Sequence, residues 1–301
     1  MKRTAYILFL LIPILAPGKL PAQQLPNFSQ FMFNDFVLNP AIAGTRPYYE
    51  IRSNSRFQWA GVVDAPQTMS LSMYGPHSKK NMGFGGYLFN DITGPTSRTG
   101  LYGSYAYNVE VRDGIRLSMG LSGGILQNKV DGTRITLFEP NDQALKDAIY
   151  SNYSPDASVG LYAYGENWFA GFSAFQLFAN SLKYYDVKTG LNKLKTHYYL
   201  MGGYRYEINS DFQVEGSALI KKVTPVPFQF EFNVKSTYMD KFWLGLSYRS
   251  SDALSVLIGY IHMEKYYFGY AYDIGLSDFR KYNSGSHEIM IGVRFNKIKN
   301  Q

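Results

Sequence analysis

Residues 228–239 alternate between apolar and polar side chains. A β-strand sends successive side chains to opposite faces, so this segment predicts a strand with one apolar face and one polar face. The apolar positions include Phe228, Phe230, Phe232, Val234 and Tyr238, and the polar positions include Gln229, Glu231, Asn233, Lys235 and Thr237. Because similar alternation recurs from residue 49 to residue 295, the pattern favours a barrel in lipid over a soluble sandwich.

Segments of this kind, separated by turn signals, predict an all-β fold: a transmembrane antiparallel β-barrel of about 14 strands. A short N-terminal non-barrel segment precedes the first strand. The expected strands are 49–59, 66–74, 81–90, 98–110, 115–130, 157–164, 168–177, 196–208, 212–222, 228–239, 242–250, 253–261, 266–273 and 285–295.

Short and longer connections alternate between these strands. Tight turns are expected at 112–114, 165–167, 209–211, 239–241 and 262–265. Longer connections are expected at 131–156, 178–195 and 274–284, and Ser251-Asp252 is the one exception. Outer-membrane barrels have short periplasmic turns and longer external loops, so we expect the outer membrane of a Gram-negative bacterium. An even strand number places both termini in the periplasm.

The first 22 residues have the pattern of a secretory signal peptide. Lys2 and Arg3 precede the short apolar stretch 5–15, and Ala22 ends a small-residue cleavage site. A membrane anchor is the alternative, but the apolar stretch is too short to span a bilayer.

The segment 23–48 is rich in Phe, Asn and Pro and shows little alternation. It predicts a plug in the lumen or a docking segment in the periplasm, because so many exposed Phe side chains are unfavourable in water. The barrel is expected over 49–296, and residues 297–301 form a short periplasmic tail.

Composition supports this picture. The chain has 26 Tyr, 21 Phe and 28 Gly, which suit strands, membrane interfaces and barrel bends. It has no Cys, which excludes disulfides and thiolate metal sites. Loss of Lys2, Arg3 and Lys19 with the signal peptide lowers the formal charge from +7 to +4. No basic run suits nucleic acid, so we expect no nucleic-acid partner.

Charged side chains at the polar positions of the predicted strands are expected to face the lumen. We favour a hydrated lumen with mutually paired charges over a substrate path, because polar interiors are normal in such barrels. These residues are Glu215, Lys221, Glu231, Lys235, Glu288 and Arg294.

The motifs that could indicate catalysis are weak. Residues 120–124 match the nucleophile elbow G-x-S-x-G, but Ser122 lies inside a predicted strand with no helix after it. The four His residues are dispersed, which argues against a metal site. The glycine-rich run 83–87 lacks the ending of a phosphate loop and predicts barrel curvature. We expect no enzymatic activity, no cofactor and no metal.

Two segments are too specific for a linker: residues 24–34 followed by 39–44, and residues 56–61 followed by 65–68. Together with later landmarks they resemble the PorP/SprF family of type IX secretion system outer-membrane proteins of Bacteroidetes. The later landmarks are 105–107, 270–273 and 284–289. One departure is Ile42, where an aromatic residue is expected in the N-P-A-x-A-G run.

This resemblance implies a non-enzymatic accessory role in type IX secretion, with export or surface attachment of cargo proteins and gliding motility. The implied partners are outer-membrane lipids, periplasmic ring lipoproteins and cargo with a C-terminal sorting domain. The candidate partner-binding residues are Phe28, Gln30, Met32, Asn34, Asn39, Pro40, Arg56 and Trp59. The alternative is a general solute channel of the porin type, which the acidic loop 138–142 would constrict.

Overall fold

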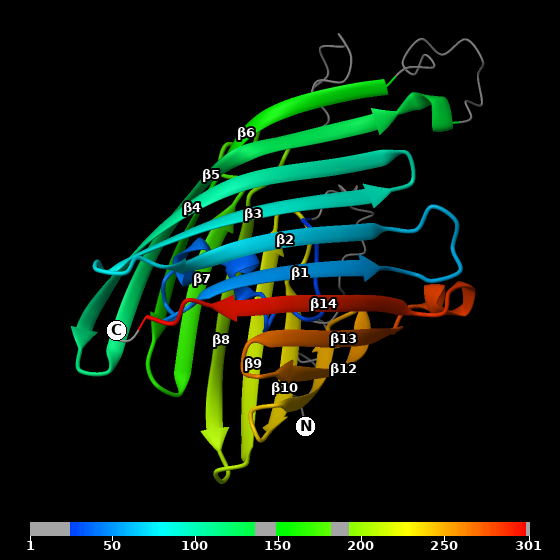
Figure 1. Cartoon of the computed structure of the whole chain (residues 1–301). Coiled ribbons are helices and arrows are strands. Elements are labelled where there is room, and N and C mark those ends of the chain that lie inside the picture. Colours follow the sequence, from blue (N-terminus) through cyan, green and yellow to red (C-terminus); the bar gives the residue numbers. More distant parts are fainter. Residues whose placement is uncertain (1–24, 136–148, 182–192, 299–301) are drawn as a thin grey trace, which may run out of the picture.

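The computed structural model describes residues 25–135, 149–181 and 193–298. These residues form fourteen antiparallel strands in one sheet, which closes into a barrel where β1 pairs with β14 (Figure 1). Closure leaves no sheet edge, which a membrane-spanning sheet requires. The strands are β1 (Tyr49–Phe57), β2 (Gln67–Pro76), β3 (Met82–Thr93), β4 (Thr96–Arg112), β5 (Ile115–Asp131), β6 (Ile149–Tyr164), β7 (Trp168–Phe175), β8 (His197–Glu207), β9 (Phe212–Val223), β10 (Gln229–Tyr238), β11 (Phe242–Arg249), β12 (Ala253–His262), β13 (Tyr266–Gly275) and β14 (Ser286–Phe295).

The expected fold class is confirmed, and the largest error in the strand boundaries concerns β6. This strand begins at residue 149 and not at 157, and Ile149 pairs with Asp131 of β5. Residues 151–156 are rich in Ser and Asn and contain Pro155, a composition typical of a loop. Long-range pairing with β5 extends the strand despite this local signal.

The connections divide the barrel into two rims. The short-turn rim carries the connections 77–81, 113–114, 165–167, 208–211, 239–241 and 263–265. The long-loop rim carries the connections 58–66, 94–95, 224–228, 250–252 and 276–285, together with the described residues 132–135, 176–181 and 193–196. Two short 3-10 helices lie at this rim, η3 (Gly132–Arg134) and η5 (Asp278–Tyr282). The two-residue connection 94–95 was not expected, so the long-loop rim has a second short link besides 250–252. The acidic loop 138–142 lies outside the described residues.

The outer face of the barrel is apolar, and the inner face carries the polar positions. On β10, Phe232 and Val234 are each 55% exposed, whereas Glu231 is 0% and Asn233 is 2% exposed. This alternation matches the expectation for 228–239 and gives the barrel a lipid-facing surface. Among the described residues, no helix is long and apolar enough to cross a bilayer.

We expect an arginine on the lipid-facing side of β10 to be more harmful at the middle of the strand than at its end. Val234 lies in the middle of β10, and Phe230 is its second residue. Val234→Arg should destabilise the barrel by about 2–4 kcal/mol, and Phe230→Arg by about 0–1 kcal/mol, because the effect decreases toward the interface. Unfolding in lipid vesicles measures both values. Equal losses would contradict the depth assigned to these positions.

Candidate functional site: a plugged lumen with a vestibule

Residues 25–44 lie inside the barrel, and we call this segment the plug. It contains two short 3-10 helices, η1 (Asp35–Leu38) and η2 (Pro40–Ile42), visible as the dark blue coils inside the barrel in Figure 1. Pro40 suits the first position of η2, and the Asn39 side chain caps this helix by accepting a hydrogen bond from the Ala41 N–H at 2.9 Å. The plug therefore has compact local structure but contributes no strand to the sheet.

The apolar side chains of the plug form the hydrophobic core of the molecule with inward residues of the wall. Phe28 and Phe36 are each 3% exposed, and Ile42 is 0% exposed. The Phe33 ring lies 4.1 Å, centroid to centroid, from the Trp243 ring of β11. Burying each such side chain stabilises the folded state by roughly 1.5–3 kcal/mol relative to exposure. This burial favours the plug inside the lumen over a segment extended into water.

Glycines on the inner face of the wall make room for the plug. A Cβ added at Gly83, Gly120 or Gly160 would come within 3.0 Å of the plug backbone or of the Asn39 side chain. A side chain at any of these three positions would force the plug or the strand to move. The run 83–87 was interpreted as a source of curvature. The structure adds a second role for Gly83 and Gly85: both leave space for the plug, and a Cβ at Gly85 would collide with the Phe36 ring.

Ser29 sits at the centre of an ionic network that we call the latch: Ser29, Arg56, Arg249, Asp273 and Glu288. The Ser29 N–H donates to the Glu288 carboxylate at 2.7 Å, and the Ser29 hydroxyl donates to Asp273 at 2.8 Å. The same hydroxyl accepts from Arg56 at 2.7 Å and from Arg249 at 3.1 Å. The latch thus joins the N-terminal part of the plug to β1, β11, β13 and β14.

Hydrogen bonds along the rest of the plug satisfy several of its polar groups. Asn39 donates to the Leu161 carbonyl oxygen at 2.9 Å, while Ser118 and Ser173 each donate at 2.5 Å to a plug carbonyl oxygen, those of Ala41 and Leu38. Asn34 donates to the Asn54 side chain at 2.9 Å. A buried backbone group without a partner is unfavourable, so these serines and asparagines are what let irregular backbone lie inside the barrel.

The six charged residues expected in the lumen all form ion pairs. Glu231 binds Arg249 at 3.1 Å and Lys221 at 3.5 Å. The other pairs are Glu215–Lys235 at 3.0 Å, Glu288–Arg56 at 3.4 Å and Arg294–Glu50 at 2.6 Å. The expectation of a wet interior is wrong at Glu231 and Glu288, because both are 0% exposed. The plug excludes water there.

Several partners in these pairs were missed from the sequence. Arg249 is 0% and Arg52 is 1% exposed, and Glu50 is 0% exposed. The sequence of β1 did contain a signal for these partners, because every second position of the strand is polar or charged. These positions are Glu50, Arg52, Asn54 and Arg56. Arg249 was less visible, since it is the last residue of β11 and precedes the turn 250–252.

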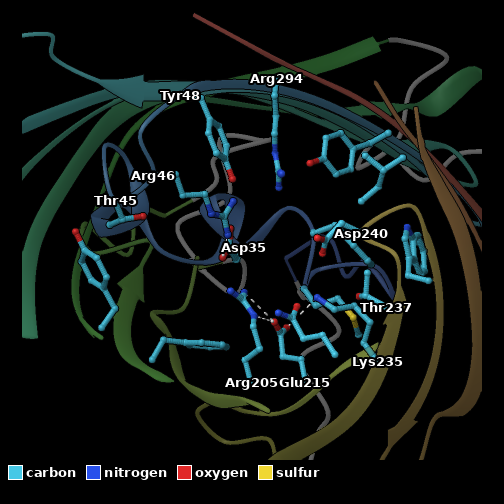
Figure 2. Close-up of a pocket in the computed structure, with 18 of the residues that line it drawn as sticks. Asp35, Thr45, Arg46, Tyr48, Arg205, Glu215, Lys235, Thr237, Asp240 and Arg294 are labelled. Atoms are coloured by element: carbon cyan, nitrogen blue, oxygen red, sulfur yellow. Dashed lines mark hydrogen bonds and ion pairs between the residues drawn. The ribbon is translucent and has the colours of Figure 1, made fainter. Parts of the chain in front are cut away.

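A cavity of about 860 Å³ opens at the short-turn rim, and we call it the vestibule. Plug residues 31–35 line its inner end, and residues of the turns 165–167 and 263–265 line its mouth. Figure 2 shows Arg205, Glu215 and Lys235 on one side and Arg46, Tyr48 and Arg294 on the other. The vestibule therefore reaches from one rim to the plug.

Two ionic clusters line the vestibule. In the first, Glu50 is shared by Arg46 at 2.7 Å, Arg52 at 3.0 Å and Arg294 at 2.6 Å. In the second, Glu215 is shared by Arg205 at 3.1 Å and Lys235 at 3.0 Å.

Arg46 also binds Asp35 of the plug at 2.6 Å. Burial raises the pKa of the Asp35 carboxyl above its ordinary value, and the Arg46 guanidinium opposes this shift. The contact ties the inner end of the vestibule to the plug.

The structure places most of the candidate partner-binding residues in the interior. The side chains of Phe28, Gln30, Asn34, Asn39, Pro40 and Arg56 are buried, so in this state they hold the plug and are not offered to a partner. Met32 lines the vestibule. Trp59 lies at the long-loop rim, is 38% exposed and packs edge-on against Phe279 with ring centroids 5.0 Å apart.

Ser122 lies inside β5, and its hydroxyl donates to the Gly103 carbonyl oxygen at 3.1 Å. It therefore serves as a strand residue of the wall. Across residues 25–135, 149–181 and 193–298, no three His, Cys, Asp or Glu side chains are grouped so that they could hold a metal ion.

This fold and site define a class of protein: a membrane β-barrel whose lumen is filled by its own N-terminal segment. The model of the family described as "Type IX secretion system membrane protein PorP/SprF" matches residues 20–293. The chain belongs to this family and is an outer-membrane β-barrel protein of the type IX secretion system.

Two solved outer-membrane proteins are among the structures to which the chain is similar. The CymD monoaromatic hydrocarbon channel is 12% identical with a TM-score of 0.49, over 92% of this chain and 94% of that chain. The outer membrane protein Omp33 of Acinetobacter baumannii is 9% identical with a TM-score of 0.48, over 83% of this chain and 97% of that chain. No curated protein matches the chain.

Proposed function

We propose that the protein is a non-enzymatic accessory of type IX secretion, which supports export or surface attachment of cargo proteins and gliding motility. Its partners are outer-membrane lipids, periplasmic ring lipoproteins and cargo with a C-terminal sorting domain. Family membership over residues 20–293 is the observation that carries this proposal. The plug is buried in the lumen, and the vestibule opens at the short-turn rim and ends at the plug. Both features favour a docking component and disfavour an open solute channel.

The barrel is proposed to insert with its short-turn rim toward the periplasm, as is usual for outer-membrane barrels. β1 begins and β14 ends at this rim, which agrees with an even strand number. The plug, however, extends from the start of β1 at the short-turn rim through the lumen toward the long-loop rim. Leu25 and Pro26 line a small cavity with Val226 and Pro227 of the long-loop rim. The first described residue therefore lies on the far side of the plug from the start of β1.

Epitope tags test this orientation. A tag inserted at 209–211 of the short-turn rim should be protected on intact cells, and a tag after Gly61 of the long-loop rim should be labelled by antibody. Both sites are exposed connections, so neither insertion disturbs the wall. Labelling of the 209–211 tag alone would reverse the orientation.

The export role is tested by deleting the gene and complementing it with the wild-type chain. Loss of the barrel should reduce cargo with a C-terminal sorting domain at the cell surface and stop gliding, and complementation should restore both. Affinity capture of the tagged barrel from solubilised outer membrane should retain periplasmic ring lipoproteins. Unchanged export and gliding in the deletion strain would contradict the proposal.

A further inference from the structure

We infer that the vestibule is a binding site for a carboxylate-bearing polypeptide segment, which enters from the short-turn rim and ends against the plug. The presence of an anion site follows from the charges and geometry of the wall. The choice of a polypeptide as its occupant rests on the proposed function in protein export.

The two ionic clusters that line the vestibule carry an excess of positive charge. Five basic side chains share three carboxylates there: Arg46, Arg52, Arg205, Lys235 and Arg294 against Asp35, Glu50 and Glu215. Each cluster therefore has fewer acids than bases. In a cavity with low-dielectric walls this imbalance attracts an anion.

The other charged residues of the lining do not continue this excess. Glu166, Asp240 and Glu264 line the mouth together with Lys265 and Lys297. Together with these residues, the charged side chains of the vestibule still carry one net positive charge, which favours an entering carboxylate.

Three guanidinium groups remain accessible from the cavity. The side chains of Arg205, Arg294 and Arg46 are 46%, 30% and 26% exposed, although all three line the inside of the barrel. A guanidinium presents its N–H donors in a planar fork that matches a carboxylate. Each of these side chains can therefore bind the carboxylate of a ligand while it keeps its existing ion pair.

Aromatic rings hold Arg294 in place. Its guanidinium carbon lies 4.5 Å from the Tyr48 ring centroid and 4.2 Å from the Tyr267 ring centroid. The group is thereby fixed between two rings, which lowers the entropy lost when it binds a ligand. Figure 2 shows Arg294 and Tyr48 projecting into the same space.

The size and surface of the vestibule fit a peptide better than a single phosphate ion. Its volume of about 860 Å³ is within the range of sites that enclose sizeable ligands. Phe33, Tyr162, Phe169 and Trp243 give it apolar wall beside the cations. Because the plug closes the inner end, the site suits a chain end or a hairpin and not a chain that passes through.

Fluorescence anisotropy with the purified full barrel in detergent tests the inference. The probe is a labelled peptide of alternating glutamate and phenylalanine with a free carboxyl terminus. Its neutral counterpart has glutamine for glutamate and an amidated end. We expect the acidic peptide to bind at least about tenfold more tightly, since hydrogen bonds to charged groups contribute a factor of this size.

Arg205→Gln should weaken binding of the acidic peptide about tenfold. Lys281→Gln, which removes the same charge from the exposed η5 at the opposite rim, should leave it unchanged. Heat-modifiable migration of both variants confirms that the barrels are folded.

Equal binding of both peptides, no saturable binding, or equal weakening by the two substitutions would overturn the site. Complete displacement of the acidic peptide by millimolar inorganic phosphate would assign the cavity to a phosphate-bearing ligand and overturn the peptide occupant. The assay contains no secretion machinery. Peptide binding together with normal export in the deletion strain would therefore refute the proposed function and leave the site standing.

Discussion

Deleting residues 25–43 is expected to convert the barrel into an ion-conducting pore. In the intact protein this segment fills the lumen with buried side chains, among them Phe28, Phe31 and Ile42. The wall does not depend on the segment for strand pairing, because β1 pairs directly with β14 and β2. Single-channel recording in planar bilayers should show discrete openings for the deletion variant and almost none for the wild type.

The matched control removes residues 61–64 from the exposed β1–β2 connection. This deletion shortens the same region of the chain but leaves the plug in place, so its conductance should equal that of the wild type. Heat-modifiable migration of all three proteins shows that the barrels are closed. A plug deletion that inserts but stays non-conducting would show that the lumen is blocked by something else.

Replacing Arg249 by methionine is expected to destabilise the barrel by about 3–5 kcal/mol, because it leaves buried carboxylates without their partner. Arg249 is 0% exposed and lies 3.1 Å from Glu231 and 3.8 Å from Asp273. The loss also removes its hydrogen bond to Ser29 of the plug.

Arg205→Met provides the comparison, since Arg205 also pairs with a lumen carboxylate but is 46% exposed. Solvent screens its pair with Glu215, so the expected loss is within about 1 kcal/mol. Denaturant titration of both variants in the same vesicles measures the difference. Similar losses for Arg249→Met and Arg205→Met would argue against a dry, plugged interior at the latch.

The strands could be predicted from the sequence because lipid imposes one rule on every strand. Apolar and polar side chains must alternate along a strand that faces lipid on one side and the lumen on the other, as Phe232 and Asn233 do on β10. The same rule identified the lumen charges by parity. It failed at the start of β6, where Pro155 and neighbouring polar residues gave a loop signal that pairing with β5 outweighed.

The position of the plug could not be settled from the sequence. Residues 25–44 have no period that identifies a partner surface, so burial in the lumen and docking in the periplasm remained equally open. The decisive features are distributed over distant strands: Gly120 and Gly160 leave space, while Ser118 and Ser173 supply donors. Each looks ordinary within its own strand, and only closure of the barrel brings them around the plug.

The most direct test of the plugged lumen is thiol accessibility, which the absence of native Cys makes unambiguous. Ile42→Cys in η2 and Val63→Cys in the β1–β2 connection are compared, since these positions are 0% and 88% exposed. With a maleimide dye and the purified barrel, Ile42→Cys should react at least about a hundredfold more slowly than Val63→Cys. The dye can reach Ile42→Cys only after local unfolding of the plug, which costs a few kcal/mol. Denaturation should make the two rates equal. Equal rates in the folded barrel would mean that residues 25–44 do not occupy the lumen.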